Sequence, residues 1–194
     1  MKKILTLIVM LTSIIIAQDF DFVGNSKCKM CHKKEEKGAQ FVKWEASHHA
    51  DAFETLKSEK AAQIAKERGL ETNAWNAPEC LKCHTTGFGD GGYEVMSESF
   101  WSPAADDKVG AKAVKRMKGL QAVGCEACHG AGSKYKSKKV MQGIHTKELS
   151  GAKYGLLSVS EETCVVCHNE SSPTFKPFNY DERIDNIAHP IPVN

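Results

Sequence analysis

Residues 28–32 read Cys28-Lys29-Met30-Cys31-His32, and this spacing of two cysteines and a histidine recurs three more times along the 194-residue chain. The other copies occupy residues 80–84, 125–129 and 164–168, so the four motifs use all eight cysteines. The cysteine pairs are Cys28 and Cys31, Cys80 and Cys83, Cys125 and Cys128, and Cys164 and Cys167, followed directly by His32, His84, His129 and His168.

A Cys-x-x-Cys-His motif has a specific chemistry. The two thiols add to the two vinyl groups of haem, and the adjacent imidazole becomes an axial ligand of the iron. Disulfides and zinc sites are the alternatives for eight cysteines, but a disulfide needs no histidine at a fixed position. An oxidising export route is also a poor place to keep eight free thiols for zinc. The sequence therefore predicts four covalently bound haem c groups.

The opposite faces of the four irons need ligands too. The remaining histidines are His48, His49, His145 and His189. Imidazole is a usual second ligand of such irons, and we expect His49, His145 and His189 to bind. His48 is the less favoured ligand because adjacent residues on a helix point about 100° apart. Methionine is the rival ligand type, but the methionines of the mature chain are expected to pack instead.

The fold class follows from the number of haems. The first cysteines of successive motifs are 52, 45 and 39 residues apart, so the chain is not a fixed-period repeat. We expect a mainly α protein, with helices and long loops wrapped around four haems and little β structure. The predicted helices cover 50–68, 112–118 and 181–188, with a further one through Phe41 to Glu45, and one strand pair is expected around 93–100.

The first seventeen residues have the pattern of an export signal. A basic start at Lys2 and Lys3 leads into an apolar run and the small residue Ala17. This predicts a signal peptide at 1–17 and a tetrahaem domain at 18–194, in the periplasm or otherwise exported, with no transmembrane segment after cleavage. An uncleaved N-terminal anchor is the alternative, because Ile15 departs from the small-residue cleavage pattern.

Charge excludes one class of partner and predicts an electric dipole. Without Lys2 and Lys3, the chain has 24 basic and 24 acidic residues, which gives no support for nucleic-acid binding. The charges are unevenly placed, however. Residues 108–139 hold nine Lys or Arg and one acid, whereas residues 148–194 hold seven acids and three bases.

Several short stretches resemble one known family. They include Gly24 to His32, Trp44 five residues before His49, and Val123 to Gly130. Together with the second and fourth motifs and their order, they make nearly all of the mature chain similar to the tetrahaem cytochrome c-554 family. This resemblance implies stacked haem pairs and an electron carrier whose donor is like hydroxylamine oxidoreductase and whose acceptor is a membrane cytochrome.

The resemblance also implies an assignment of axial ligands. It pairs His32 with His145 on the first haem, His129 with His49 on the third, and His168 with His189 on the fourth, and it leaves the His84 haem five-coordinate.

A periplasmic carrier that passes electrons between redox proteins through its haems is the function we expect. Apart from the haem motifs, the sequence shows no group of residues typical of a catalytic site, so we expect a carrier rather than an enzyme. One alternative is a reductase that acts on a small nitrogen oxide at the open His84 haem. The other is a subunit of a haem filament or of a larger membrane redox complex.

Overall fold

The structure is a computed structural model that describes residues 20–191, so the predicted signal peptide at 1–17 lies outside the described residues. Helices and connecting loops make up the described part, and no strand occurs in it. The α-helices are α1 (Ser26–His32), α2 (Gln40–Glu45), α3 (Ala52–Thr55), α4 (Glu59–Glu67), α5 (Pro78–His84), α6 (Lys108–Lys118), α7 (Cys125–His129), α8 (Lys138–His145), α9 (Glu161–Val165) and α10 (Tyr180–Arg183). Single 3₁₀ turns are η1 (Glu35–Lys37), η2 (Ala74–Asn76), η3 (Glu98–Trp101), η4 (Gly151–Tyr154) and η5 (Ile184–Asn186).

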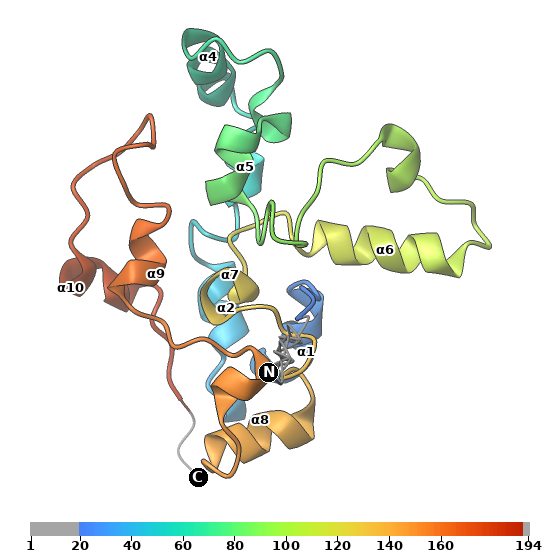
Figure 1. Cartoon of the computed structure of the whole chain (residues 1–194), viewed down its shortest axis with the longest axis vertical. Coiled ribbons are helices and arrows are strands. Elements are labelled where there is room, and N and C mark those ends of the chain that lie inside the picture. Colours follow the sequence, from blue (N-terminus) through green and yellow to red (C-terminus); the bar gives the residue numbers. More distant parts are fainter. Residues whose placement is uncertain (1–19, 192–194) are drawn as a thin grey trace, which may run out of the picture.

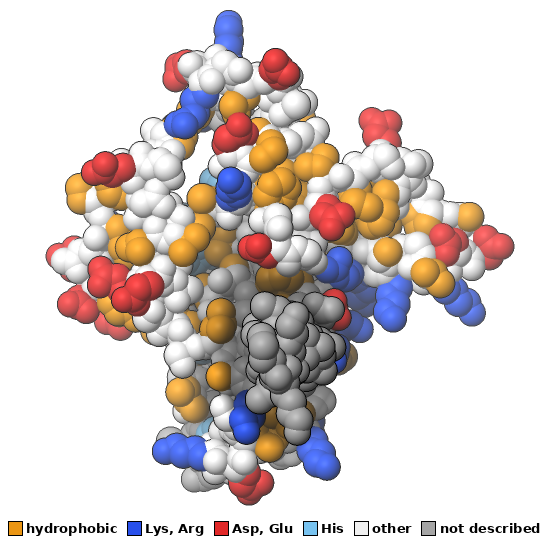
Figure 2. Space-filling view, viewed as in Figure 1, with side chains coloured by type: hydrophobic (Ala, Val, Ile, Leu, Met, Phe, Trp, Pro, Cys, Tyr) orange, Lys and Arg blue, Asp and Glu red, His pale blue; other side chains and the backbone are white. Residues whose placement is uncertain are grey.

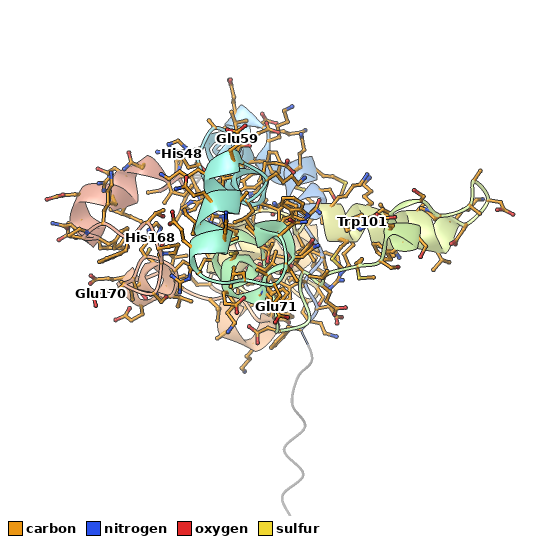
Figure 3. All side chains as sticks on the ribbon, turned by 90° about the horizontal axis from the view of Figure 1, so that it is seen from above. His48, Glu59, Glu71, Trp101, His168 and Glu170 are labelled. Atoms are coloured by element: carbon orange, nitrogen blue, oxygen red, sulfur yellow. The ribbon has the colours of Figure 1, made fainter. Side chains whose placement is uncertain are left out.

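The elements form a central column with an arm on each side (Figure 1). The column carries α4 and α5 at one end, α2, α7 and α1 in the middle, and α8 at the other end. One arm contains η3 and α6, and the other contains α9 and α10. Seen from above, Trp101 lies on the first arm, while His168 and Glu170 lie on the opposite one (Figure 3).

The apolar core is small and lies around the second Cys-x-x-Cys-His motif. Its centre is the fully buried Leu81 of α5, packed with Phe53, Leu56 and Leu120. By contrast, α1, which holds the first motif, and α9, which holds only Cys164 of the fourth, contain no buried residue. Even α6, the longest helix described, has only 11 residues, and helices this short are marginal in water without packing. The polypeptide alone therefore supplies little of the apolar contact that a domain of this length needs.

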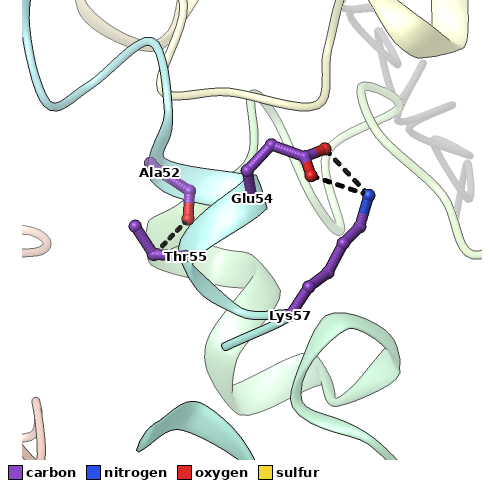
Figure 4. A network of polar contacts seen from close by, with 4 residues as sticks. All are labelled: Ala52, Glu54, Thr55 and Lys57. Carbon is purple, nitrogen blue, oxygen red and sulfur yellow. Dashed lines mark hydrogen bonds and ion pairs between the residues drawn. The ribbon is translucent and has the colours of Figure 1, made fainter. Parts of the chain in front are cut away.

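The helix predicted over 50–68 is wrong as a single element, because the chain turns between α3 and α4. Ser58 is extended and caps α4 by accepting a hydrogen bond from the Ala61 amide at 3.2 Å. In α3 the Thr55 hydroxyl donates to the Ala52 carbonyl, and Lys57 pairs with Glu54 at 2.8 Å (Figure 4). The predicted positions were therefore helical but belonged to two short helices.

The strand pair expected around 93–100 is also wrong. The Tyr93 amide bonds the Thr86 carbonyl at 2.9 Å, which closes a loop, and the segment ends in the 3₁₀ turn η3. Gly87 and Gly91 within this loop have φ of +69° and +79°, a left-handed conformation that interrupts extended pairing.

Two other predicted helices are confirmed with changed bounds. The helix expected at 112–118 begins at Lys108, because Asp107 caps it, and it ends before Gly119 as predicted. In place of the helix expected at 181–188 there are the shorter α10 and the 3₁₀ turn η5. His48 and His49 lie in a turn after α2 rather than on a helix.

Candidate haem sites

Each of the four motifs forms or adjoins one short helix. In α1, α5 and α7 the histidine is the last helical residue, while α9 contains Cys164 and precedes His168. Helical spacing puts residues three and four apart on one face, so both cysteines and the histidine can meet one ligand. All eight cysteines are free thiols, and residues 20–191 form no cluster of three or more His, Cys, Asp or Glu that could hold a metal ion. The described residues therefore offer no tetrahedral zinc site.

The closest thiol contacts join the four motifs in two pairs, and Cys128 of the third motif also lies near Cys164 and Cys167 of the fourth. The Cys28 thiol interacts with Cys125, so the first motif lies beside the third; this contact, followed by burial, raises the pKa of Cys28. The Cys83 thiol interacts with Cys167, so the second motif lies beside the fourth; this contact lowers the pKa of Cys83 to about 7. Attachment points that are far apart in the sequence are thus neighbours in space.

The distal and proximal histidines also form ring pairs. The ring centres of His49 and His168 are 6.1 Å apart, and those of His129 and His189 are 5.9 Å apart. Two imidazoles that bind one metal ion through bonds of about 2 Å have ring centres roughly 6 Å apart. Each pair therefore has the spacing that one iron requires.

These pairs exchange the partners that the family resemblance implies, which were His129 with His49 and His168 with His189. The path of the C-terminal segment accounts for the exchange. The Lys43 ammonium donates to the Asp185 carbonyl and the Gln40 amide to the Pro190 carbonyl, both at 3.0 Å. These bonds hold the segment against α2, where His189 meets His129.

Burial and neighbouring cationic groups favour the neutral form of these imidazoles, which is the form that binds a metal. Burial, and after it the neighbouring His168 and His48, lowers the pKa of His49. Burial, followed by His189 and His32, lowers the pKa of His129.

His189 gives an independent indication of a missing ligand partner. Its Nδ1 is buried and has no hydrogen-bond partner within the described structure. A buried nitrogen without a partner is costly, and coordination or a rearranged hydrogen bond in the haem-bound protein removes that cost. The free thiols, the ring spacing and this nitrogen all fit haem c.

Two proximal histidines are anchored through Nδ1, which leaves Nε2 free for an iron. His32 Nδ1 lies 3.1 Å from the Gln40 side-chain oxygen. His84 Nδ1 lies 2.5 Å from the Ala52 carbonyl oxygen and 3.3 Å from the Thr55 hydroxyl. The sequence analysis missed Gln40, Ala52 and Thr55, because their roles depend on contacts across 8 to 32 residues that no motif marks.

Three predicted ligands, His32, His84 and His145, do not enter a ring pair within the described residues. His145 is exposed at the end of α8, and within residues 20–191 no ring contact joins it to His32. His84 likewise has no imidazole ring partner in that part of the chain. His48 is exposed in the turn after α2.

Comparison with known proteins gives a consistent match. A family model described as cytochrome c554 and c-prime matches residues 27–130, which contain the first three motifs. The chain is 32% identical over 170 residues to cytochrome c-554 of Nitrosomonas europaea, an alignment that covers 81% of this chain and 63% of that protein. It thus spans less than two thirds of that relative. The solved structure of reduced cytochrome c554 from the same organism matches with a TM-score of 0.53 and 27% identity, covering 87% of this chain and 78% of the other.

Proposed function

The chain belongs to the cytochrome c-554 family, and from this premise we propose that it is an exported tetrahaem electron carrier. Bound haem c supplies an iron that alternates between the ferric and ferrous states and so holds one electron at a time. The observation that carries the proposal is the spatial pairing of motifs, first with third and second with fourth. It brings the attachment points of two haems together twice, as an electron carrier requires.

The chain's own residues have separate tasks in this proposal. The eight cysteines hold four haems covalently, which keeps them in place during repeated electron transfer. His32, His84, His129 and His168 bind the irons on the proximal side, and His49 and His189 bind on the distal side of two of them. Gln40 and the Ala52 carbonyl orient His32 and His84 through Nδ1. His145 remains the ligand proposed for the first haem by family resemblance.

Location and partners are part of the same proposal. The N-terminal sequence supports export to the periplasm. No helix in residues 20–191 is long and apolar enough to cross a membrane. The partners we propose are redox proteins, with a hydroxylamine oxidoreductase-like donor and a membrane cytochrome acceptor.

One measurement tests the carrier directly. In coulometry of the purified holoprotein, we expect four electrons per chain to be taken up and released reversibly. A Cys164→Ser/Cys167→Ser variant should accept three, because α9 has no buried residues and its loss leaves the core around α5 intact. Uptake of fewer than four electrons by the parent protein would contradict a tetrahaem carrier.

A reductase at the His84 haem is the second candidate, because His84 ends the helix whose Leu81 lies at the centre of the core, and it has no imidazole ring partner in residues 20–191. Sustained consumption of nitric oxide by the pre-reduced protein, at the rate of electron supply, would favour this enzyme over the carrier. A single binding event without turnover favours the carrier.

A further inference from the structure

A buried glutamate lies inside the third haem-attachment motif. Glu126 follows Cys125 in α7, and only 1% of its surface is exposed. The corresponding residues of the other motifs are Lys29, Leu81 and Val165, none of which carries a negative charge. The third motif therefore differs from the other three in having a carboxylate built into its attachment loop.

The carboxylate is held entirely by backbone amides. It accepts hydrogen bonds from Val23 at 2.9 and 3.0 Å, from Gly24 at 2.7 Å and from Gly132 at 2.6 Å. All of these partners are donors, which suits an ionised carboxylate. No Lys or Arg side chain within residues 20–191 forms an ion pair with it. The negative charge is therefore solvated by dipoles rather than cancelled by an opposite charge.

Neighbouring groups respond to this charge. Burial, and after it the Glu126 carboxylate, raises the pKa of Tyr135. The same carboxylate disfavours a second negative charge on Cys28 of the first motif, adding to the larger effects of the Cys125 contact and burial. The field of Glu126 thus extends over the attachment points of the first and third haems.

We propose that Glu126 is a fixed negative charge that lowers the reduction potential of the haem held by Cys125 and Cys128. A ferric haem carries one more positive charge than a ferrous haem, so a nearby carboxylate that is screened little by water stabilises the ferric state. Cys28 lies beside Cys125, and the first haem therefore feels the same charge. The inference rests on the proposed carrier function and adds a direction to it: the charge biases an electron away from the first and third haems.

The test is a spectroelectrochemical titration of the holoprotein and of Glu126→Gln. We expect the ratio of reduced to oxidised haem, at a fixed solution potential, to rise at least tenfold for one or two of the four haems. This is an upward shift of about 59 mV for a one-electron couple. Glu79→Gln is the matched control, because Glu79 also adjoins a haem-attachment cysteine, Cys80, but is exposed. In this control variant, the ratio of reduced to oxidised haem at the same solution potential should change less than about twofold for every haem.

The outcomes separate this inference from the proposed function. Four haems with all potentials unchanged in Glu126→Gln would overturn the inference and leave the carrier intact, whereas fewer than four haems in the parent protein would contradict the carrier itself. If Glu126→Gln does not assemble, Glu126→Asp decides, because it retains the charge on a shorter side chain. In Glu126→Asp the ratio of reduced to oxidised haem at a fixed potential should stay within about twofold of the parent value, even if the variant is less stable. A tenfold rise in that ratio would overturn the inference.

Discussion

At the scale of single residues, the iron sites depend on histidines contributed by distant parts of the chain. His189 comes from the C-terminal segment and lies beside His129 of α7, and His49 lies beside His168. Phe178 stacks on the His168 ring, with centres 4.6 Å apart and planes 18° apart. Such stacking restricts ring rotation and helps to fix the direction of the ligand nitrogen. Ligation of one iron by His189 and His129, as proposed, would hold the C-terminal segment against the central column.

The pairing of His189 with His129 predicts a specific ligand loss. His189→Ala should convert one low-spin ferric haem to high spin, because that iron loses its second imidazole. Electron paramagnetic resonance measures the change. In the parent protein, nuclear Overhauser contacts should connect the His189 and His129 imidazoles to the same haem methyl groups. Contacts that connect His189 and His168 to one haem would instead support the pairing implied by resemblance.

A second residue-scale prediction concerns the His84 haem. His48 is exposed in a turn, so we expect it not to bind this iron. The parent protein should show one high-spin signal beside three low-spin signals, and His48→Ala should leave this pattern unchanged. His49→Ala is the control, since it should create a new high-spin signal. Four low-spin signals, of which one becomes high-spin in His48→Ala, would contradict an open site.

The proximal ligands of these sites can be proposed from the sequence, but the groups that support them cannot. The spacing Cys80-x-x-Cys83-His84 is local and its chemistry is encoded within five residues. The Ala52 carbonyl that orients His84 is 32 residues away and is a backbone group, so no side-chain pattern could indicate it. The position of Glu126 within the third motif is evident from the sequence. Its burial is not, because it depends on where residues 23, 24 and 132 lie in the fold.

At the scale of elements, α1 and α7 are joined closely through Asn25 and Gly124. The Asn25 side chain is buried and accepts a hydrogen bond from the Cys125 amide at 3.1 Å. A Cβ atom on Gly124 would lie 2.8 Å from Cγ of Asn25. A glycine here allows the first and third motifs to approach each other.

This packing predicts the effect of a single methyl group. Gly124→Ala should reduce the free energy of unfolding by about 1–3 kcal/mol, because the buried Asn25 cannot move away freely. Denaturant unfolding of the holoprotein measures the change. Gly89→Ala is the control, because a Cβ added at Gly89 has no neighbour within 4 Å and therefore causes no clash. Any cost of this control reports the backbone strain of an alanine at a φ of +87°.

A double-variant cycle identifies the contact. In an Asn25→Ala background, Gly124→Ala should cost less than in the parent protein, because the overlapping atoms are gone. Equal costs in both backgrounds would show that the clash with Asn25 is not the cause.

The end of α6 before Gly119 was predicted from a local signal, whereas its start was placed four residues too late because the cap at Asp107 was not recognised. Helix bounds were not predictable where periodicity continued through a turn, as at Ser58 between α3 and α4. Gly87, Gly89, Gly91 and Gly92 are typical of a loop, but its closure by the Tyr93 amide depends on the backbone path. With much of the apolar contact expected from haem, side-chain periodicity carries less information than in a domain with a larger core.

At the scale of the whole molecule, charge is unevenly distributed. Basic side chains gather beneath the α6 arm, which also carries acidic ones on its upper and outer parts, and acidic side chains predominate on the arm with α9 and α10 (Figure 2). Lys108, Lys112 and Lys115 recur at helical spacing and are exposed, opposite the buried Val114 and Met117. The sequence predicted this uneven distribution from composition alone, since residues 108–139 are basic and residues 148–194 are acidic.

Bound haem should make the net charge of the mature protein negative. Without Lys2 and Lys3 the polypeptide is formally neutral. Each oxidised haem adds two negative propionates and an iron porphyrin core with one positive charge, a net −1, so the holoprotein should carry about −4 when oxidised if these carboxylates are ionised. Isoelectric focusing of the mature form should therefore give an isoelectric point well below the value of about 8.1 that the sequence alone predicts. Focusing near that value would show that the propionates are neutralised or that haems are missing.

The central claim is that all four motifs of this one chain hold haem c. Intact-mass spectrometry of the protein, produced together with a cytochrome c maturation system, tests it most directly. We predict a mass equal to the processed polypeptide plus four haems, retained under denaturing conditions because each is bound through two thioether bonds. A mass with fewer than four haems, or one that fits the polypeptide with four disulfides, would contradict the account.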